Sequence, residues 1–301
     1  MSTVAADRIT RIPDPGEQVP VLAWPTLSIF VGGNLLWFGA AALYLTGTIP
    51  FWASIPLNAI ASFVLFTVAH DAAHHSLSSN TQLNTWLGRL STPMFAPHAS
   101  YRVWRFIHMQ HHRHTNHDDG SDPDHYCIEC PRWQLPLRFM TIDIYYLVFY
   151  ARHIGKRPAA EKRGLAYQLL FTGSVVTACV ATGHGVDFLV VYLIPQRISI
   201  TFLAYAFDWL PHTGLHETPK GDKLKTTRNR VGHESLLSPL LLFQNYHLVH
   251  HLHPIVPFYK YIAVWRRNEE QYLAGEPALS TVRGRPLTPD EYRALRAHDH
   301  H

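Results

Sequence analysis

The stretch that decides the fold is Gln244-Asn-Tyr-His-Leu-Val-His-His-Leu-His-Pro254. If it is helical, His247, His250 and His251 stand at positions i, i+3 and i+4, so their imidazoles point to one face. Imidazole nitrogens bind iron, zinc, copper and nickel. We therefore expect this stretch to be a helix that presents ligands to a metal ion.

Two further histidine groups, far away in the sequence, have similar spacing. His108, His111 and His112 repeat the i, i+3, i+4 pattern, while His70 and His74 stand one helical turn apart at the end of a long apolar run. The three groups can serve one centre only if the fold brings their helices together. So many imidazoles in one protein indicate more than one metal ion.

The composition indicates a membrane protein with a substantial aqueous part. Of 301 residues, 47% are hydrophobic and only 16% are charged, which is low for a soluble protein. The mean hydropathy of -0.06 is too polar for a chain that lies wholly in lipid. The net charge of +4 gives no support to nucleic-acid binding. Three cysteines are too few for a disulfide framework, which favours a reducing compartment.

Four apolar stretches are long enough to cross a bilayer, which takes about 17–25 residues. A short uncharged link joins the first two stretches, and another joins the last two, so each pair is expected to form a hairpin. The expected fold is all-α: an integral membrane protein with about four transmembrane helices and a helical cap that holds a histidine-rich di-metal site. The expected spans are residues 21–47, 49–69, 165–182 and 186–207.

The segment between the second and third spans is expected to hold two shorter helices. Residues 81–90 alternate polar and apolar side chains at helical spacing, as an interfacial helix does. Residues 140–150 are apolar but too short to cross a bilayer, so we expect a buried or interfacial helix there. Arg197 is a charged residue inside the fourth expected span, where a charge is costly. We expect either that its side chain faces a polar interior or that the helix begins later in the sequence.

The basic residues other than Arg197 fall in the two termini and in the long segments after the second and fourth spans. By the positive-inside rule these parts are cytoplasmic. All the histidine groups and both termini are thus expected on the cytoplasmic side of an inner or plasma membrane. We divide the chain into a flexible N-terminal tail, a membrane metal-binding domain and a C-terminal cytoplasmic tail. These cover residues 1–20, 21–262 and 263–301.

Spacing argues against two other metal motifs. A zinc metalloprotease needs His-Glu-x-x-His, and neither His216-Glu217 nor His233-Glu234 has the second histidine. Cys127 and Cys130 have the spacing of a zinc or redox pair, but the chain has no second pair of this kind, so we expect a structural role.

One more histidine belongs with the three groups. His212 ends the fourth expected span on the same side as the others, and Asp208 lies one helical turn before it. An aspartate at the membrane edge is costly unless it is paired or binds a metal. Three roles for Asp208 are therefore open: a direct metal ligand, a ligand through water, or a partner that orients His212.

With these motifs the chain resembles the membrane fatty-acid desaturase/hydroxylase superfamily, whose members carry three histidine boxes between about four spans. The finer resemblance is to the bacterial β-carotene hydroxylases of desaturase type, and it covers roughly residues 65–262. The stretches that carry it are Phe207-Asp-Trp-Leu-Pro-His212, Thr227-Arg-Asn-Arg230, Gln244-Asn-Tyr-His-Leu-Val-His-His251, His253-Pro-Ile-Val-Pro-Phe-Tyr-Lys-Tyr261, and His108-Met-Gln-His-His112 followed by Asn116 and Asp122-Pro-Asp-His125.

The resemblance implies a di-iron centre held by nine histidines. In the better-known desaturases an asparagine stands four residues before the isolated histidine and contacts an iron through water, whereas here that position is Asp208. The residues expected to contact and orient the ligands are Asp71, Asn116, Asp124 and Asn245. The implied iron ligands are His70, His74, His108, His111, His112, His212, His247, His250 and His251.

The resemblance also implies oxidation of a lipid dissolved in the membrane, with two iron ions and with O2 as co-substrate. The reaction expected first is hydroxylation of a carotenoid ring. Desaturation of a fatty-acyl chain comes second and carotenoid ketolation third, since all three share the boxes. The chain has no flavin, haem or dinucleotide motif, so we expect a ferredoxin-like protein to deliver electrons. A membrane protein that transports or stores metal is the non-enzymatic alternative, although transport favours ionisable groups within the spans rather than at their ends.

Overall fold

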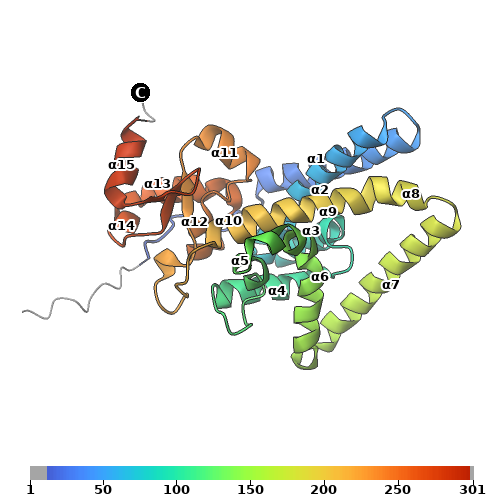
Figure 1. Ribbon diagram of the computed structural model, residues 1–301, viewed down its shortest axis with the longest axis horizontal. Helices are drawn as coiled ribbons and strands as arrows, with labels where there is room; N and C mark the ends of the chain where they lie inside the picture. Colours follow the sequence, from blue (N-terminus) through green and yellow to red (C-terminus); the bar gives the residue numbers. More distant parts are fainter. Residues whose placement is uncertain (1–11, 299–301) are drawn as a thin grey trace, which may run out of the picture.

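The computed structural model describes residues 12–298, and Figure 1 shows their arrangement. Long helices extend to one end of the molecule, while short helices and a small sheet occupy the other end (Figure 1). The first eleven residues of the predicted N-terminal tail and the last three residues of the chain lie outside the described part.

Four helical segments of the described chain are long and apolar enough to cross a membrane, as predicted. A long helix suits lipid because it satisfies its backbone hydrogen bonds within itself. The first two segments form a hairpin, and the third diverges from the other three (Figure 1). The four segments are α1 (Trp24–Leu45), α2 (Phe51–Ala73), α7 (Ala159–Ala181) and the continuous rod Gly185–His212.

The fourth rod is not a regular α-helix throughout. Two stretches of it are wound as π-helix, and the second of these lies shortly before His212. Because a π-turn holds more residues than an α-turn, it changes the direction of the side chains that follow. In order, the rod consists of α8 (Gly185–Phe188), the π-stretch Leu189–Leu193, α9 (Ile194–Leu203), the π-stretch Ala204–Trp209 and α10 (Leu210–His212).

Arg197 in α9 is paired with an acidic residue. Its Nη1 donates to Oδ1 of Asp143 at 3.0 Å and to the backbone carbonyl of Met140 at 2.7 Å. Asp143 belongs to α6 (Leu135–His153), and its side chain is only 4% exposed. The charge inside the fourth predicted span is therefore neutralised by a buried partner.

The two shorter helices predicted between the second and third spans are both present and both longer than expected. α3 (Thr81–Phe95) begins at Asn80, whose side chain accepts hydrogen bonds from the backbone N–H groups of the first turn. α6 has a proline in its first turn, where the fixed φ of proline favours a helix start. Two more helices complete this part of the chain: α4 (Tyr101–His114) and α5 (His125–Ile128).

The chain beyond the fourth span folds around an aromatic core. The fully buried ring of Trp265 stacks on Tyr272 at 4.9 Å, and its indole N–H donates to Oη of Tyr292 at 2.8 Å. Residues 263–298 are thus packed onto the rest of the cap, while the domain boundary at residue 262 stays a prediction. The helices here are α11 (Glu234–Leu240), α12 (His247–Leu252), α13 (Tyr261–Arg267), α14 (Glu269–Leu273) and α15 (Pro289–His298).

A small sheet in the same region was not predicted from the sequence. β1 (Asn229–Val231) pairs in parallel with β2 (Leu279–Thr281), and β2 pairs antiparallel with β3 (Pro286–Leu287). Strands this short carry too few residues for a recognisable alternation of polar and apolar side chains. The described chain is otherwise helical. Its 3₁₀ turns are Arg132–Gln134, Ile154–Lys156, Lys223–Lys225 and Phe258–Lys260.

The described part of the predicted N-terminal tail contacts α13 and the residue that follows it. Nη2 of Arg267 donates to Oε1 of Glu17 at 2.8 Å, and the side-chain amide of Asn268 donates to the carbonyl of Asp14 at 2.8 Å. These contacts hold the segment before α1 against the cap.

Candidate metal centre

All nine predicted histidines meet where the ends of α2, α4, α10 and α12 come together. Their ring nitrogens form two groups, and within each group the nitrogens lie within 4.8 Å of one another. Cluster A comprises His70, His74, His108, His112 and His250, and cluster B comprises His111, His212, His247 and His251.

In cluster A, rings from three helices place their Nε2 atoms close together. The distance between Nε2 atoms is 2.7 Å for His74 and His108, 3.1 Å for His70 and His250, and 2.9 Å for His112 and His250. Two nitrogens at right angles on an ion with bonds of about 2.0–2.1 Å lie about 3 Å apart. The spacing of cluster A therefore fits ligands that share one metal ion.

Cluster B has the same character and contains a buried nitrogen without a partner. Nε2 of His247 and Nε2 of His251 lie 3.1 Å apart, and the ring of His212 lies 5.1 Å from each of these rings. Nε2 of His212 is buried and has no hydrogen-bond partner in the described chain. Buried polar atoms normally have partners, so a metal ion bound by this cluster would satisfy the nitrogen.

The sequence pattern indicated one ligand face on each helix, but the structure divides the histidines of α4 and of α12 between the two clusters, while both histidines of α2 join cluster A. His111 and His112 are neighbours on α4 and point to different clusters, because successive residues of an α-helix differ by about 100°. On α12, His250 joins cluster A while His247 joins cluster B. The clusters adjoin each other, since the rings of His112 and His251 stack at 4.2 Å.

Burial favours the neutral form of most of these imidazoles. It lowers the pKa of six of them well below the usual value for histidine, and neighbouring imidazoles lower it further. A neutral ring offers a lone pair to a metal without first losing a proton. The donor set therefore fits metal ions in both clusters. The six are His74, His108, His112, His247, His250 and His251.

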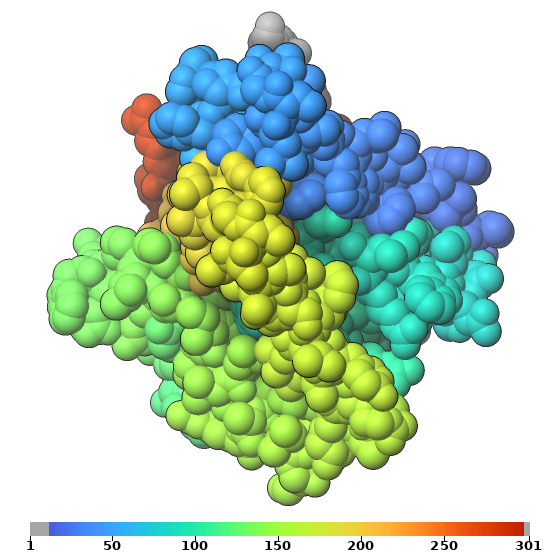
Figure 2. Space-filling view, turned by 90° about the vertical axis from the view of Figure 1, so that its right-hand side faces the viewer, coloured from blue at the N-terminus to red at the C-terminus, as the bar shows by residue number. Residues whose placement is uncertain are grey.

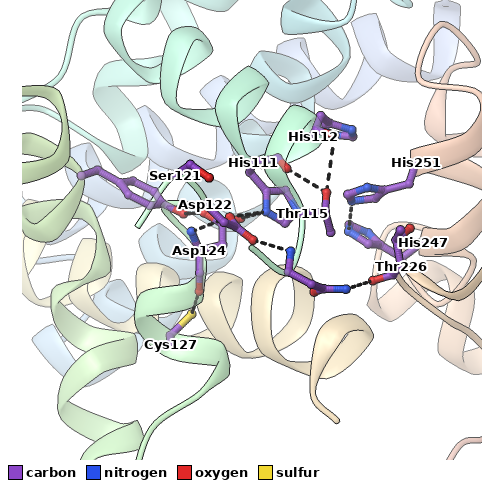
Figure 3. A network of polar contacts seen from close by, with 12 residues as sticks. His111, His112, Thr115, Ser121, Asp122, Asp124, Cys127, Thr226, His247 and His251 are labelled. Carbon is purple, nitrogen blue, oxygen red and sulfur yellow. Dashed lines mark hydrogen bonds and ion pairs between the residues drawn. The ribbon is translucent and has the colours of Figure 1, made fainter. Parts of the chain in front are cut away.

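His111 differs because two carboxylates lie beside it. Its Nδ1–H donates to Oδ1 of Asp122 at 2.9 Å and lies 3.2 Å from Oδ2 of Asp124. Burial alone would lower the pKa of His111, but Asp124 and Asp122 outweigh burial and raise it to about 9. The carboxylates lie on one side of the ring, and His247 and His251 lie on the other (Figure 3).

Three further residues that were not predicted as site residues support this arrangement. Tyr146 donates to Oδ1 of Asp124 at 2.5 Å, Nδ1–H of His247 donates to Oε1 of Gln244 at 2.6 Å, and Oη of Tyr261 lies 3.0 Å from Nδ1 of His250. Gln244 stands three residues before His247, so its closeness in the sequence contained a signal for it. Tyr146 lies on α6, and only the fold brings it to the site.

The four residues expected to orient the ligands have different surroundings. Asp124 contacts His111, and Asp71 lies 3.9 Å from Nδ1 of His70 while it accepts a hydrogen bond from a threonine of α1. The side-chain amide of Asn116 donates to two backbone carbonyls of the loop before β1, and that of Asn245 donates to a backbone carbonyl of β1. Neither side chain makes a hydrogen bond to a histidine of the described chain. Their geometry is that of residues that hold the loops around the clusters.

A narrow cavity of about 50 Å³ borders both clusters. Its walls are mostly apolar and include Phe66, Phe95 and Phe207. Asp208 also lines this cavity, and its carboxylate makes no hydrogen bond or ion pair with the described residues. The carboxylate therefore faces the space beside the histidines, and its three suggested roles stay open.

Comparison with known proteins gives one family and several relatives. The family model for fatty acid desaturases matches residues 46–283. A β-carotene ketolase from a Paracoccus species is 28% identical over 249 residues, which is 80% of this chain and 86% of the relative. A dihydrorhizobitoxine desaturase from Bradyrhizobium elkanii is 28% identical over 65% of this chain and 61% of its own length. A ferredoxin-type sn-1 acyl-lipid omega-3 desaturase from a Synechocystis species is 42% identical over 19% of this chain and 16% of its own.

Proposed function

We propose that this chain, which belongs to the fatty acid desaturase family, uses O2 to hydroxylate a lipid dissolved in the membrane, with the ring of a carotenoid as its substrate. Family membership makes it an oxidoreductase of the non-haem di-iron type and disfavours the metal-transport alternative. The observation that carries the proposal is the convergence of nine histidines in two adjoining clusters beside a mostly apolar cavity.

The nine histidines are proposed to hold two iron ions, one in each cluster. Iron supplies the electrons that activate O2 and the oxidising power that an unactivated C–H bond requires. The chain itself contributes the geometry. Its buried rings fix the site, the phenylalanines of the cavity exclude water, and the packed walls hold one carbon of the substrate near the clusters.

Ketolation is the second candidate reaction. It is favoured by the β-carotene ketolase that aligns with 80% of this chain. A ketone at a methylene carbon requires two successive oxidations of that carbon, and the alcohol is formed first. Hydroxylation and ketolation thus differ in how often one carbon is oxidised.

The clusters are proposed to lie on the cytoplasmic side, where a ferredoxin-like donor supplies electrons. They sit at one end of the spans, and basic residues gather in the segments at this end. One relative carries ferredoxin in its name, which supports a donor of this kind. A separate donor docks on a complementary charged surface, so electron delivery should weaken as salt increases.

Product analysis tests the reaction. The full chain is expressed in a carotene-producing host, next to a His108→Ala/His111→Ala double variant that loses one ligand from each cluster. We expect hydroxylated carotenoid from the wild type and unchanged carotene from the variant, measured by liquid chromatography and mass spectrometry. A keto product assigns the second candidate. Unchanged carotene together with new unsaturated fatty acids would contradict both.

Metal analysis of the purified chain is an independent test. We expect about two iron ions per chain and consumption of O2 when an electron donor is added. Many zinc ions per chain, without iron and without O2 consumption, would refute the proposed centre.

A further inference from the structure

A second polar site lies away from the histidines, where α3, the start of α4 and the first turns of α7 meet. It is a pocket of about 390 Å³, and Arg89, Arg102 and Arg163 contribute to its walls. The lining includes no aspartate or glutamate. The three arginines come from three different helices, so the fold gathers positive charge at this place.

None of these arginines has an acidic partner. Across the described residues, the side chains of Arg89, Arg102 and Arg163 make no hydrogen bond or ion pair, and the guanidinium of Arg89 lies over the ring of Trp86 at 5.0 Å. Nearby Arg157, by contrast, makes two hydrogen bonds of 2.8 Å to Glu161. The pocket therefore has a positive charge that the surrounding chain does not neutralise.

Two hydroxyl groups in the same pocket also lack partners. Oη of Tyr101 and Oγ of Ser100 are buried and have no hydrogen-bond partner in the described chain, and Tyr101 is only 5% exposed. Buried hydroxyls without partners are uncommon and costly. Both residues line the pocket, although solvent does not reach either hydroxyl oxygen.

The N-terminus of α4 faces this pocket as well. Ser100 is the N-cap residue of this 14-residue helix, but its side chain makes no capping hydrogen bond, and the first turn contains no acidic residue. The backbone N–H groups at a helix start favour an anion. The arginines and the helix start thus both suit one ligand with a negative charge and several oxygens.

An apolar groove of about 1010 Å³ continues from this pocket, and Pro93 and Gln168 line both. The groove runs between α1, α7 and the fourth rod. On α7 its lining extends from Gln168 to Thr182, which corresponds to about 21 Å along the helix axis. That length exceeds half of the hydrocarbon core of a bilayer, which is about 30 Å thick.

Figures 1 and 2 show how α7 is placed relative to the other long helices. α7 diverges from α1, α2 and α9 and meets the fourth rod only near its far end (Figure 1). Seen from that end, the blue α1–α2 hairpin lies above the yellow fourth rod, and the yellow-green α7 lies below it (Figure 2). No residue of the apolar half of α7 is buried, so the face of α7 that lines the groove has room for a ligand.

We propose that an anionic phospholipid of the surrounding membrane binds here, with its phosphate at Arg89, Arg102 and Arg163 and an acyl chain in the groove between α7 and α1. A free phosphate would use the polar pocket but not the groove. The three unneutralised arginines favour a headgroup with net negative charge over a zwitterionic one. The proposal does not depend on which reaction the histidine clusters catalyse.

The first experiment measures lipid binding to the purified full chain by native mass spectrometry, with phosphatidylglycerol and phosphatidylcholine as probes. We expect tighter binding of phosphatidylglycerol. Each arginine replaced by glutamine should weaken that binding about fivefold, and the triple variant about 100-fold. The matched control is Arg152→Gln, an exposed arginine of α6 outside the pocket, which should bind like wild type. Equal binding by the triple variant and the wild type, or equal affinity for the two lipids, would overturn the proposal.

A second experiment separates lipid from free phosphate without touching the arginines. Ala178→Trp places a large ring in the groove, whereas Val180→Trp adds the same ring to the opposite face of α7. We expect Ala178→Trp to weaken phosphatidylglycerol binding about tenfold, and Val180→Trp to leave it unchanged. If Ala178→Trp has no effect and inorganic phosphate competes as well as the lipid, the site binds a free anion and the lipid proposal is wrong. Circular dichroism of every variant establishes that it is folded.

Discussion

Asp122 and Asp124 give His111 an environment that the other imidazoles of the centre lack. Asp122 accepts a hydrogen bond from Nδ1–H, and Asp124 lies 3.2 Å from the same nitrogen, so Nε2 is the nitrogen left for cluster B. A carboxylate behind a ligating histidine fixes the orientation of the ring and increases its basicity. Asp122 also accepts the backbone N–H groups of Asn116 and Asp124, so the same side chain shapes the loop after α4.

Replacing Asp122 by alanine should weaken metal binding. We expect a loss of about 10–100-fold in the affinity of one metal position, as is typical when a carboxylate that supports a histidine ligand is removed. Iron content after dialysis against a graded chelator measures this loss. Asp118→Ala, an exposed change in the same loop, should retain wild-type iron content. Equal iron loss in the two variants would show that the loop as a whole, and not the contact with His111, determines affinity.

Much of the site was predictable at this scale, and part of it was not. The spacing of His70 and His74, and of the two His-x-x-His-His groups, identified the histidines that meet in the structure. The division of neighbours such as His111 and His112 between two clusters depends on how α4 crosses the other helices. Sequence spacing contains no information on that crossing.

At the scale of helices, α6 and α9 are joined by one buried ion pair. The carboxylate of Asp143 also accepts from the side-chain amide of Gln196 at 3.1 Å. A pair of this kind contributes little net stability, but breaking it leaves one charge buried without a partner. α6 lies against the cavity beside the histidines, so the pair also helps to fix one cavity wall.

Removing only the positive partner should be strongly destabilising. Arg197→Met leaves the Asp143 carboxylate buried without its guanidinium partner, beside only His98 and the amide of Gln196, and we expect the free energy of unfolding to fall by about 3–5 kcal/mol. The double variant Arg197→Met/Asp143→Asn should recover part of this loss, because no charge is then buried. Unfolding in detergent mixtures measures both variants. If the double variant is the less stable of the two, the unpaired charge is not the cause.

The contact between α3 and α4 depends on the absence of a side chain at Gly88. A Cβ at this position would lie 2.3 Å from the ring of Tyr101. We expect Gly88→Ala to lower the thermal unfolding midpoint, with a cost of about 1–3 kcal/mol for overpacking. Gly39→Ala, in α1, is the matched control, because no atom lies within 4 Å of its added Cβ. That variant should be neutral or slightly stabilising. A neutral Gly88→Ala would mean that the ring of Tyr101 moves freely.

Helices that cross a membrane were the most predictable elements. Length and apolar composition are local properties, so the four predicted spans agree with the observed segments to within a few residues at most ends. The sheet was missed for the opposite reason. β1 and β2 are separated by some fifty residues, and their pairing depends on how α13 and α14 bring the chain back.

For the whole molecule, the predicted superfamily and the mostly helical membrane fold are confirmed. The finer step to a carotenoid hydroxylase stays a proposal, since the relatives include ketolases and desaturases. Histidine spacing cannot distinguish these reactions because they use the same ligands. The difference must come from the cavity walls, which are built by side chains from several helices.

The metal centre also depends on the aromatic core of the C-terminal part. Trp265 is fully buried, and the core around it includes Tyr261, which contacts His250, and Tyr246, which directly precedes α12. We expect Trp265→Ala to reduce the free energy of unfolding by about 3–5 kcal/mol and to lower the iron content. Trp133→Ala, which removes a ring that is 79% exposed, should change neither quantity. Full iron content in a destabilised Trp265→Ala chain would show that the two regions are independent.

The π-stretch Ala204–Trp209 makes the direction of the His212 side chain depend on how the few residues before it are wound. A π-turn holds an extra residue relative to an α-turn, so a substitution there that made the same residues wind as an ordinary α-helix would change the rotation of the rod. Every later side chain of the rod would then swing by about 100°. His212 would leave its cluster, although each histidine would still be encoded and the span would still be long enough for the bilayer. A search of gene sequences that counts histidine boxes would score such a chain as intact, although one of the nine clustered histidines had left the site.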